Sequence, residues 1–308
     1  MPGRTQTKKL LLLWAMGADA AKAHGPRFKS FFACGSTQPF FSKKEVLPLA
    51  FLLFLSACAS PDAHAPAFAQ RGYEPFSRAD AVAVATDEWR LWGMRVDDDW
   101  GAGYVQHDAT MGERQPGLWQ RVGEYWWEGM NTSEPDNAWT GKHDANGKVF
   151  SVAVNGDYAW SAAFISYVMR IAGAGKDFPY SPDHAVYINY AARAAKGEIQ
   201  NPLLIAENPA IYAPRLGDLI CFGRGSARNL TFADLPTAHL FPAHCAIVIA
   251  GTVHQISVVG GNVDDAVTMK HVPVTPDGKL ATPDGVVLDT RYPWMVVLQL
   301  MVGATPVS

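Results

Sequence analysis

The spacing of apolar residues changes along the chain, and this change limits the fold more than any other feature. In four segments between about residues 78 and 196, apolar residues recur three and four positions apart, which is the spacing of a helix with one buried face. From about residue 218, they form short runs bounded by glycine, proline and asparagine, which favour strands. Helices that precede strands, rather than alternating with them, predict an α+β fold with N-terminal helices packed on an antiparallel sheet.

The same pattern places the individual elements. Helices are expected over 78–93, 117–130, 160–172 and 183–196. Strands are expected over 149–154, 218–222, 245–250, 253–259 and 294–301. The segment 96–115 is rich in glycine and aspartate and is expected to be a loop.

Composition excludes some classes of protein. The 308 residues are 48% hydrophobic and 18% charged, which is ample apolar material for a core. The formal net charge is -3, and a nucleic-acid-binding protein would need a basic face, so no nucleic-acid partner is expected. No apolar stretch reaches the roughly 18–20 residues that a membrane-spanning helix needs.

A targeting signal is expected near the N-terminus. Lys43 and Lys44 precede an apolar run over 46–55, and the sequence L-S-A-C then ends at Cys58. This L-S-A-C segment resembles the lipobox of bacterial lipoproteins, in which the cysteine is lipidated and becomes the new N-terminus. The resemblance implies that a lipid on Cys58 anchors the protein to a membrane. Because Ala59 follows instead of Asp, it also implies the outer membrane, with the protein facing the periplasm.

These features divide the chain into three parts. Residues 1–57 are the expected signal region, and because a signal peptide starts near the initiator, 1–42 indicate a misassigned start. Residues 58–76 are expected to hold the lipidated cysteine and a flexible tether, since they are rich in proline and small residues. Residues 77–308 are expected to form a single domain.

Short motifs within 157–270 carry a family resemblance. They are D-Y-A-W-S-A-A-F-I-S at 157–166, P-R-L-G-D-L-I-C at 214–221, H-C-A-I-V-I at 244–249 and V-V-G-G-N-V at 258–263. Together they resemble the papain-like peptidoglycan hydrolases of the CHAP and NlpC type. The form W-S-A-A-F-I-S, with G-D-L-I-C and H-C-x-I-V, looks like a bacterial domain family of unknown function.

The resemblance implies a papain-like fold and a set of catalytic residues. His244 would be the general base, and Asn262 would orient it. Ser161 occupies the position at which the hydrolases carry their nucleophilic cysteine, at the start of a helix that favours developing negative charge. The implied activity is attack by Ser161 on an amide or ester bond of peptidoglycan, without any cofactor.

The serine leaves two functions open. A Ser hydroxyl stays protonated until attack, and its imidazolium partner favours a carboxylate, which Asp264 or Asp265 could supply. The first function is therefore a hydrolase, with Tyr158, Trp160 and Asp264 expected in its substrate pocket. The alternative is a catalytically silent module that uses the same cleft to bind wall peptides or a protein partner.

Two cysteines lie on neighbouring expected strands. Cys221 and Cys245 are either small core residues or a cross-strand disulfide, which an oxidising compartment would permit. Alternation along the strand places Cys245 on the face opposite His244, so it is a poor replacement nucleophile.

The other histidines show no spacing typical of metal ligands, and the sequence predicts no metal site. They include His107, His143, His184, His239, His254 and His271.

Overall fold

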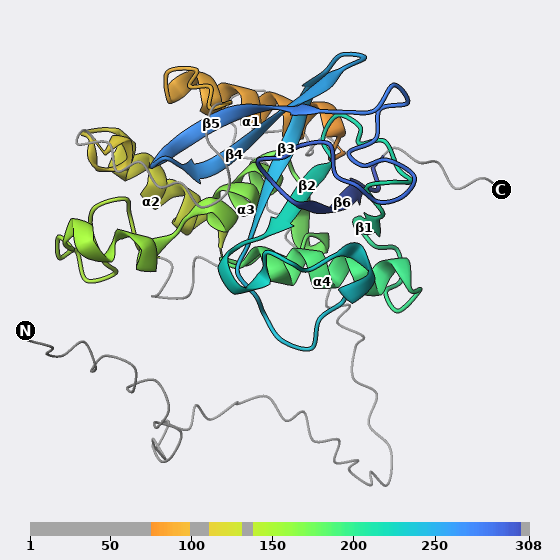
Figure 1. The fold of residues 1–308 in the computed structure, drawn as a ribbon. Helices are drawn as coiled ribbons and strands as arrows, with labels where there is room; N and C mark the ends of the chain where they lie inside the picture. The colour runs from red at the N-terminus through yellow and green to blue at the C-terminus, as the bar shows by residue number, and fades with distance from the viewer. Residues whose placement is uncertain (1–74, 99–110, 131–137, 303–308) are drawn as a thin grey trace, which may run out of the picture. The chain divides into compact units, whose positions relative to one another are not determined.

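The computed structural model describes residues 75–98, 111–130 and 138–302. Its helices are α1 (Arg78–Leu91), α2 (Leu118–Gly129), α3 (Ser161–Ile171) and α4 (His184–Ala195). Its strands are β1 (Leu204–Glu207), β2 (Leu219–Gly223), β3 (Ala243–Gly251), β4 (Gln255–Val263), β5 (Ala266–Pro273) and β6 (Trp294–Leu300). The strands form one six-stranded antiparallel sheet in the order β1-β6-β2-β3-β4-β5 (Figure 1). The expected α+β class is confirmed.

The structure differs from the expected elements at three places. The strand expected over 149–154 is wrong, because the chain there enters a 3-10 helix, η4 (Val152–Tyr158). The valines of this segment are exposed, so pairing them in a sheet would bury no apolar face. The missed β1 is only 4 residues long. The missed β5 contains the buried Lys270, whose ammonium contacts Asp97 and the Tyr292 hydroxyl, each at 2.5 Å.

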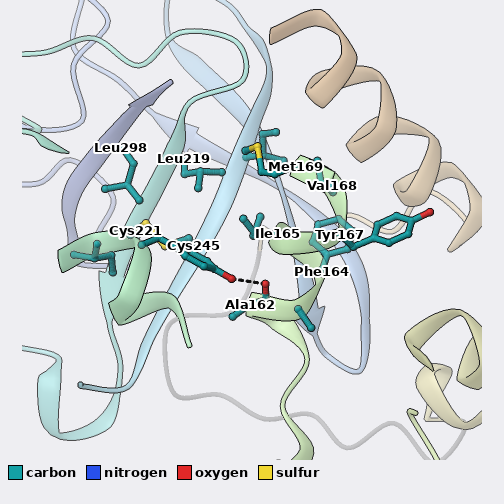
Figure 2. Packing of buried hydrophobic residues seen from close by; sticks show 14 of the residues in the cluster. Ala162, Phe164, Ile165, Tyr167, Val168, Met169, Leu219, Cys221, Cys245 and Leu298 are labelled. Atoms are coloured by element: carbon teal, nitrogen blue, oxygen red, sulfur yellow. Dashed lines mark hydrogen bonds between the residues drawn. A yellow bond between two sulfur atoms is a disulfide. The ribbon is translucent and has the colours of Figure 1, made fainter. Parts of the chain in front are cut away.

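The sheet is covered on both faces. One face packs against the helices, with α3 lying on β3 and β4, and α4 lying on β1. Figure 2 shows this interface, in which Ile165 and Met169 of α3 lie near Leu219 on the sheet. The other face forms a second apolar cluster, in which segment 274–292 covers β2, β3 and β4. The amphipathic spacing of 160–172 thus buries α3 as expected.

The G-D motif at 217–218 has a structural role. Asp218 is fully buried, and its carboxylate accepts hydrogen bonds from Arg78 at 2.6 Å, Tyr212 at 2.9 Å and the Leu300 amide at 2.8 Å. These contacts join the start of α1 to the ends of β2 and β6. A buried carboxylate with several donors, one of them charged, is well compensated for its loss of hydration.

A disulfide joins the two central strands. Cys221 and Cys245 are directly opposite in the β2–β3 register, and their sulfurs are bonded. This is one of the two alternatives that the sequence left open. Because Cys245 follows His244, the crosslink also restrains the strand that carries this histidine.

The expected signal region, Cys58 and the tether up to residue 74 lie outside the described residues. Within the described part of the chain, no helix combines the length and the apolar character needed to cross a membrane.

Candidate functional site

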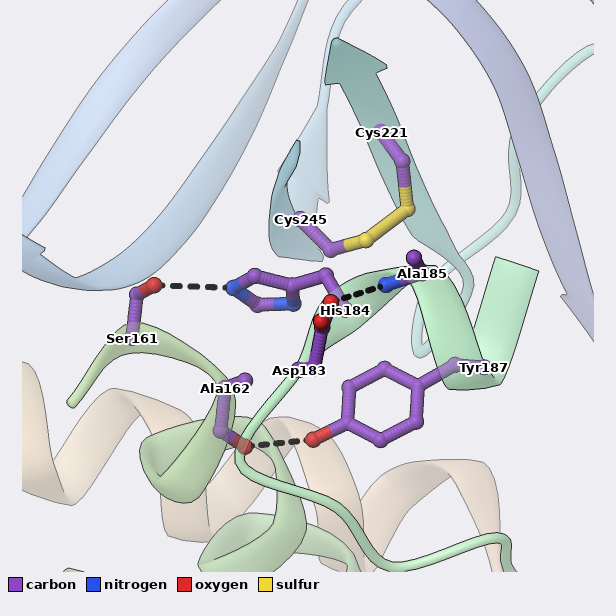
Figure 3. The surroundings of a disulfide bond; sticks show 8 residues. All are labelled: Ser161, Ala162, Asp183, His184, Ala185, Tyr187, Cys221 and Cys245. Carbon is purple, nitrogen blue, oxygen red and sulfur yellow. Dashed lines mark hydrogen bonds between the residues drawn. A yellow bond between two sulfur atoms is a disulfide. The ribbon is translucent and has the colours of Figure 1, made fainter. Parts of the chain in front are cut away.

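The hydroxyl of Ser161 lies at the N-terminal end of a buried helix. Ser161 is the first residue of α3, and its side chain is almost completely buried. The first backbone N–H groups of a helix have no partner within it, so the start of α3 presents donors and a partial positive charge beside the hydroxyl. Ser161 Oγ lies 2.9 Å from Nε2 of His184, within hydrogen-bonding distance (Figure 3).

His184 lies at the start of a second helix. It is the first residue of α4, and the side chain of Asp183 caps this helix by accepting a hydrogen bond from the Ala185 amide at 2.8 Å. The hydrogen bond between Ser161 and His184 therefore joins two helix N-termini. Two such ends favour negative charge between them and disfavour an imidazolium ring.

Burial lowers the pKa of His184 to about 3, and the charge of Arg224 acts in the same direction. The ring is therefore neutral near pH 7, and Nε2 can accept the Ser161 proton if the ring hydrogen is on Nδ1. Among the residues that the structure places, none hydrogen-bonds to Nδ1 of His184. The orienting carboxylate of a serine protease triad has no counterpart at this nitrogen within the described ranges.

The predicted base, His244, lies beside this pair. Its ring centroid is 5.5 Å from that of His184 and 5.6 Å from that of Phe222. Burial, together with His184, Arg224 and Lys270, holds the pKa of His244 well below its usual value. The hydroxyl of Ser161 is hydrogen-bonded to His184 rather than to the predicted His244. The catalytic role of His244 stays a prediction.

Two glycines allow the groups of this site to approach one another. A Cβ added at Gly260 would lie 2.7 Å from Nε2 of His244. A Cβ added at Gly261 would lie 2.5 Å from the Cβ of Phe164 and 2.9 Å from the Trp160 ring. The G-G pair of the fourth motif is therefore needed for space, at the point where β4 passes the start of α3.

Replacing Gly261 with alanine is expected to destabilise the protein by about 1–3 kcal/mol, because the added methyl group overpacks the contact with α3. Urea unfolding followed by circular dichroism measures this loss. Gly251→Ala is the matched control on β3, because its Cβ would have only ordinary contacts, the nearest at 3.5 Å. Equal stability of the two variants would contradict the packing argument.

The remaining predicted site residues have different surroundings. Asn262 is half-buried with φ 54°, and no described hydrogen bond joins its side chain to either site histidine. Burial raises the pKa of Asp264, and Asp97 adds to this effect. Tyr158 stacks on Phe150 with ring centroids 4.2 Å apart. Their predicted roles, and that of Trp160, stay predictions.

Trp160 belongs to the apolar core. Its indole is fully buried and stacks on Trp92, with ring centroids 5.4 Å apart. Its ring nitrogen donates a hydrogen bond to Glu113 at 2.6 Å, and Glu113 also accepts one from Asn155.

Sequence reasoning missed His184, Glu113 and Asn155 as parts of the site. The helix expected over 183–196 already places His184 in its first turn, after Asp183 as N-cap, but nothing in the sequence indicates that this helix start meets Ser161. Glu113 and Asn155 had no such signal, because both lie outside the regular elements that apolar spacing predicts. Their position depends on contacts between segments about forty residues apart.

The arrangement offers a nucleophile, a proton acceptor and hydrogen-bond donors for an oxyanion. Ser161 supplies the hydroxyl, Nε2 of His184 can take its proton, and the first N–H groups of α3 can bind developing negative charge. Across the described ranges, no three His, Cys, Asp or Glu side chains gather in a way that could hold a metal ion.

Comparison with known proteins yields a family without an assigned function. No curated protein and no solved structure matches the chain. A family model matches residues 113–300, which include α2, both site helices and all six strands of the sheet. The chain therefore belongs to the bacterial family described as "Uncharacterized protein conserved in bacteria (DUF2272)".

Proposed function

We propose that the domain is a hydrolase of amide or ester bonds, with Ser161 as its nucleophile and peptidoglycan as its substrate. The observation that carries this proposal is the 2.9 Å contact between Ser161 Oγ and His184 Nε2 at the start of α3. The wall substrate and a papain-like relationship are supported by the sequence motifs at 157–166, 214–221, 244–249 and 258–263.

The proposed reaction is a two-step acyl transfer. Ser161 Oγ attacks the carbonyl carbon while its proton passes to Nε2 of His184. The backbone N–H groups at the start of α3 stabilise the oxyanion, and His184 returns the proton to the leaving amine or alcohol. Water then hydrolyses the acyl-serine ester, with His184 accepting a proton from that water and returning it to Ser161.

The base in this proposal is His184 rather than the predicted His244. In the hydrogen-bonded geometry, Nε2 of His184 is already within reach of the proton that must leave. The ring of His244 lies 5.5 Å from that of His184, centroid to centroid, and the charge of His184 helps to lower the pKa of His244. Its neutral ring can help exclude water from the pair.

The test is incubation of the full chain with purified peptidoglycan, with released products read by mass spectrometry. The proposal predicts new soluble fragments whose masses correspond to hydrolysis of one bond type. Products that are unchanged from those of a protein-free incubation would contradict it.

A second candidate function is a silent module that binds wall peptides. It is favoured by the low basicity of His184, whose pKa is lowered to about 3, and by the absence of a described partner at its Nδ1. A base of such low proton affinity assists proton transfer weakly at neutral pH. Co-sedimentation with peptidoglycan in the absence of any released fragment would favour this function over the hydrolase.

We also propose that the protein is lipid-anchored through Cys58, on the outer membrane facing the periplasm. The basic pair and the L-S-A-C segment support this location. Replacing Cys58 with serine is expected to abolish lipidation and to move the protein from the membrane fraction to the soluble fraction, or to leave it uncleaved. Fractionation and intact-mass analysis check this. Membrane association and mass identical to those of the parent would refute the anchor.

A further inference from the structure

A buried carboxyl group lies directly behind the residue that precedes Ser161. Glu113, in the 3-10 helix η2 (Gly112–Arg114), is 3% exposed. One of its oxygens accepts the indole N–H of Trp160 at 2.6 Å, and the other accepts the side-chain amide of Asn155. Both hydrogen-bond donors are neutral, which is an unusual environment for a buried acid.

Trp160 connects this carboxyl group to the site. It is the N-cap residue of α3 and directly precedes Ser161, and its carbonyl accepts the first hydrogen bond of the helix, from Phe164 at 2.9 Å. Its fully buried indole packs against the rings of Trp92 and Tyr125, with centroids 5.4 Å and 5.5 Å away. A rotation of this indole would therefore disturb the start of α3.

We propose that Glu113 is a positioning residue whose ionised carboxylate fixes Trp160 and, through it, the first turn of α3. The indole N–H and the amide NH₂ can only donate hydrogen bonds, so each needs an acceptor. An ionised carboxylate accepts at both oxygens. A protonated carboxyl group presents a hydroxyl to one of the two donors, so one hydrogen bond weakens and the contact rearranges. The consequence for the reactivity of Ser161 rests on the proposed function.

Burial and the charges around Glu113 place the ionisation of its carboxyl group near neutral pH. Burial raises the pKa of Glu113 to about 7, and Asp265 in the turn between β4 and β5 acts in the same direction. The hydrogen bonds from Trp160 and Asn155 and the charge of Arg114 act against it. Arg95 also lies near η2, because a Cβ added at Gly112 would lie 3.7 Å from the Arg95 guanidinium. The carboxylate form therefore predominates only above about pH 7.

The test follows nuclear magnetic resonance signals of the full chain carrying Cys58→Ser while pH is varied from about 5 to about 9. The signals are the Trp160 indole N–H, assigned by its loss in Trp160→Phe, and the backbone amide of Ser161. In the parent, both are expected to shift with a common midpoint near pH 7. In Glu113→Gln, this titration should vanish, because glutamine does not ionise. Glu128→Gln, which removes an exposed carboxyl group from α2, should titrate like the parent.

Two results would overturn the inference. One is an indole signal that does not titrate in the parent, which needs no variant and is unaffected by folding defects. The other is an indole that titrates while the Ser161 amide does not follow it.

If hydrolysis occurs, Glu113→Gln should lower the rate of hydrolysis about tenfold above about pH 8 and leave that rate unchanged below about pH 6. If hydrolysis is absent from the parent, the proposed function fails, and the two signals still decide the role of Glu113.

Discussion

Replacing Ser161 with alanine is expected to lower the rate of peptidoglycan hydrolysis by about 10²-fold. In serine proteases, the complete triad contributes about 10⁶ to kcat, and replacing the aspartate with asparagine lowers kcat by about 10⁴. The His184 ring has no described carboxylate at Nδ1, so most of the triad contribution is absent here. The remaining factor of about 10² is the part that the hydroxyl and the imidazole supply together.

His184→Ala is expected to lower the rate by a similar factor, and the double variant to lose no more than either single one, because the two residues act as a unit. Ser226→Ala, an exposed serine outside the site, is the matched control and should keep full activity. His244→Ala should have a smaller effect than His184→Ala. The reverse order would make His244 the base, as the sequence motifs imply, and would contradict the assignment to His184.

Glu113→Gln is expected to remove a pH-dependent contribution of about 3 kcal/mol to the free energy of unfolding. A raised carboxyl pKa means that the folded state holds the proton more tightly than the unfolded state does. The stabilisation from Glu113 is therefore fully present below the ordinary value of 4.5 and is lost as pH rises to about 7. This shift of roughly two and a half pKa units corresponds to about 3 kcal/mol.

The measurement is urea unfolding at several values between about pH 4 and about pH 8. Relative to Glu113→Gln, the parent should lose stability across this range, whatever constant difference the altered hydrogen bonds add. Glu128→Gln is the control for the loss of a carboxyl group at an exposed position. Parallel pH profiles for the parent and Glu113→Gln would show that the Glu113 pKa is ordinary.

At this site, stability and the proposed function oppose each other. The ionised Glu113 that holds Trp160 in place is the form whose burial is unfavourable. A domain of this size has only about 5–15 kcal/mol of net stability, so a loss of about 3 kcal/mol is substantial. Such a cost is expected where a charged group has a positioning role.

The helices and most of the sheet could be predicted because apolar spacing reports local burial. The predicted helix over 160–172 corresponds to α3, and 245–250 lies within β3. The strand β5 was missed because Lys270 and its neighbours interrupt the apolar pattern. Burial of this lysine is favoured by contacts with Asp97 and Tyr292, which are distant in the sequence.

The position of Ser161 at a helix start was also predictable, but its partner was not. Motif order favoured His244, which lies in β3, whereas the hydroxyl of Ser161 is hydrogen-bonded to a histidine on α4. A single sequence specifies which helices form, but the contact between the ends of α3 and α4 arises from how both helices pack on the sheet.

In the proposed function, Ser161 is a nucleophile activated by its neighbour His184. A serine-directed fluorophosphonate tests it most directly, because the serine oxygen displaces fluoride from phosphorus and leaves a stable adduct. Mass spectrometry of the digested protein should locate this adduct on the peptide containing Ser161, and His184→Ala should greatly reduce it. An unlabelled Ser161, under conditions that fully label a known serine hydrolase, would contradict the account.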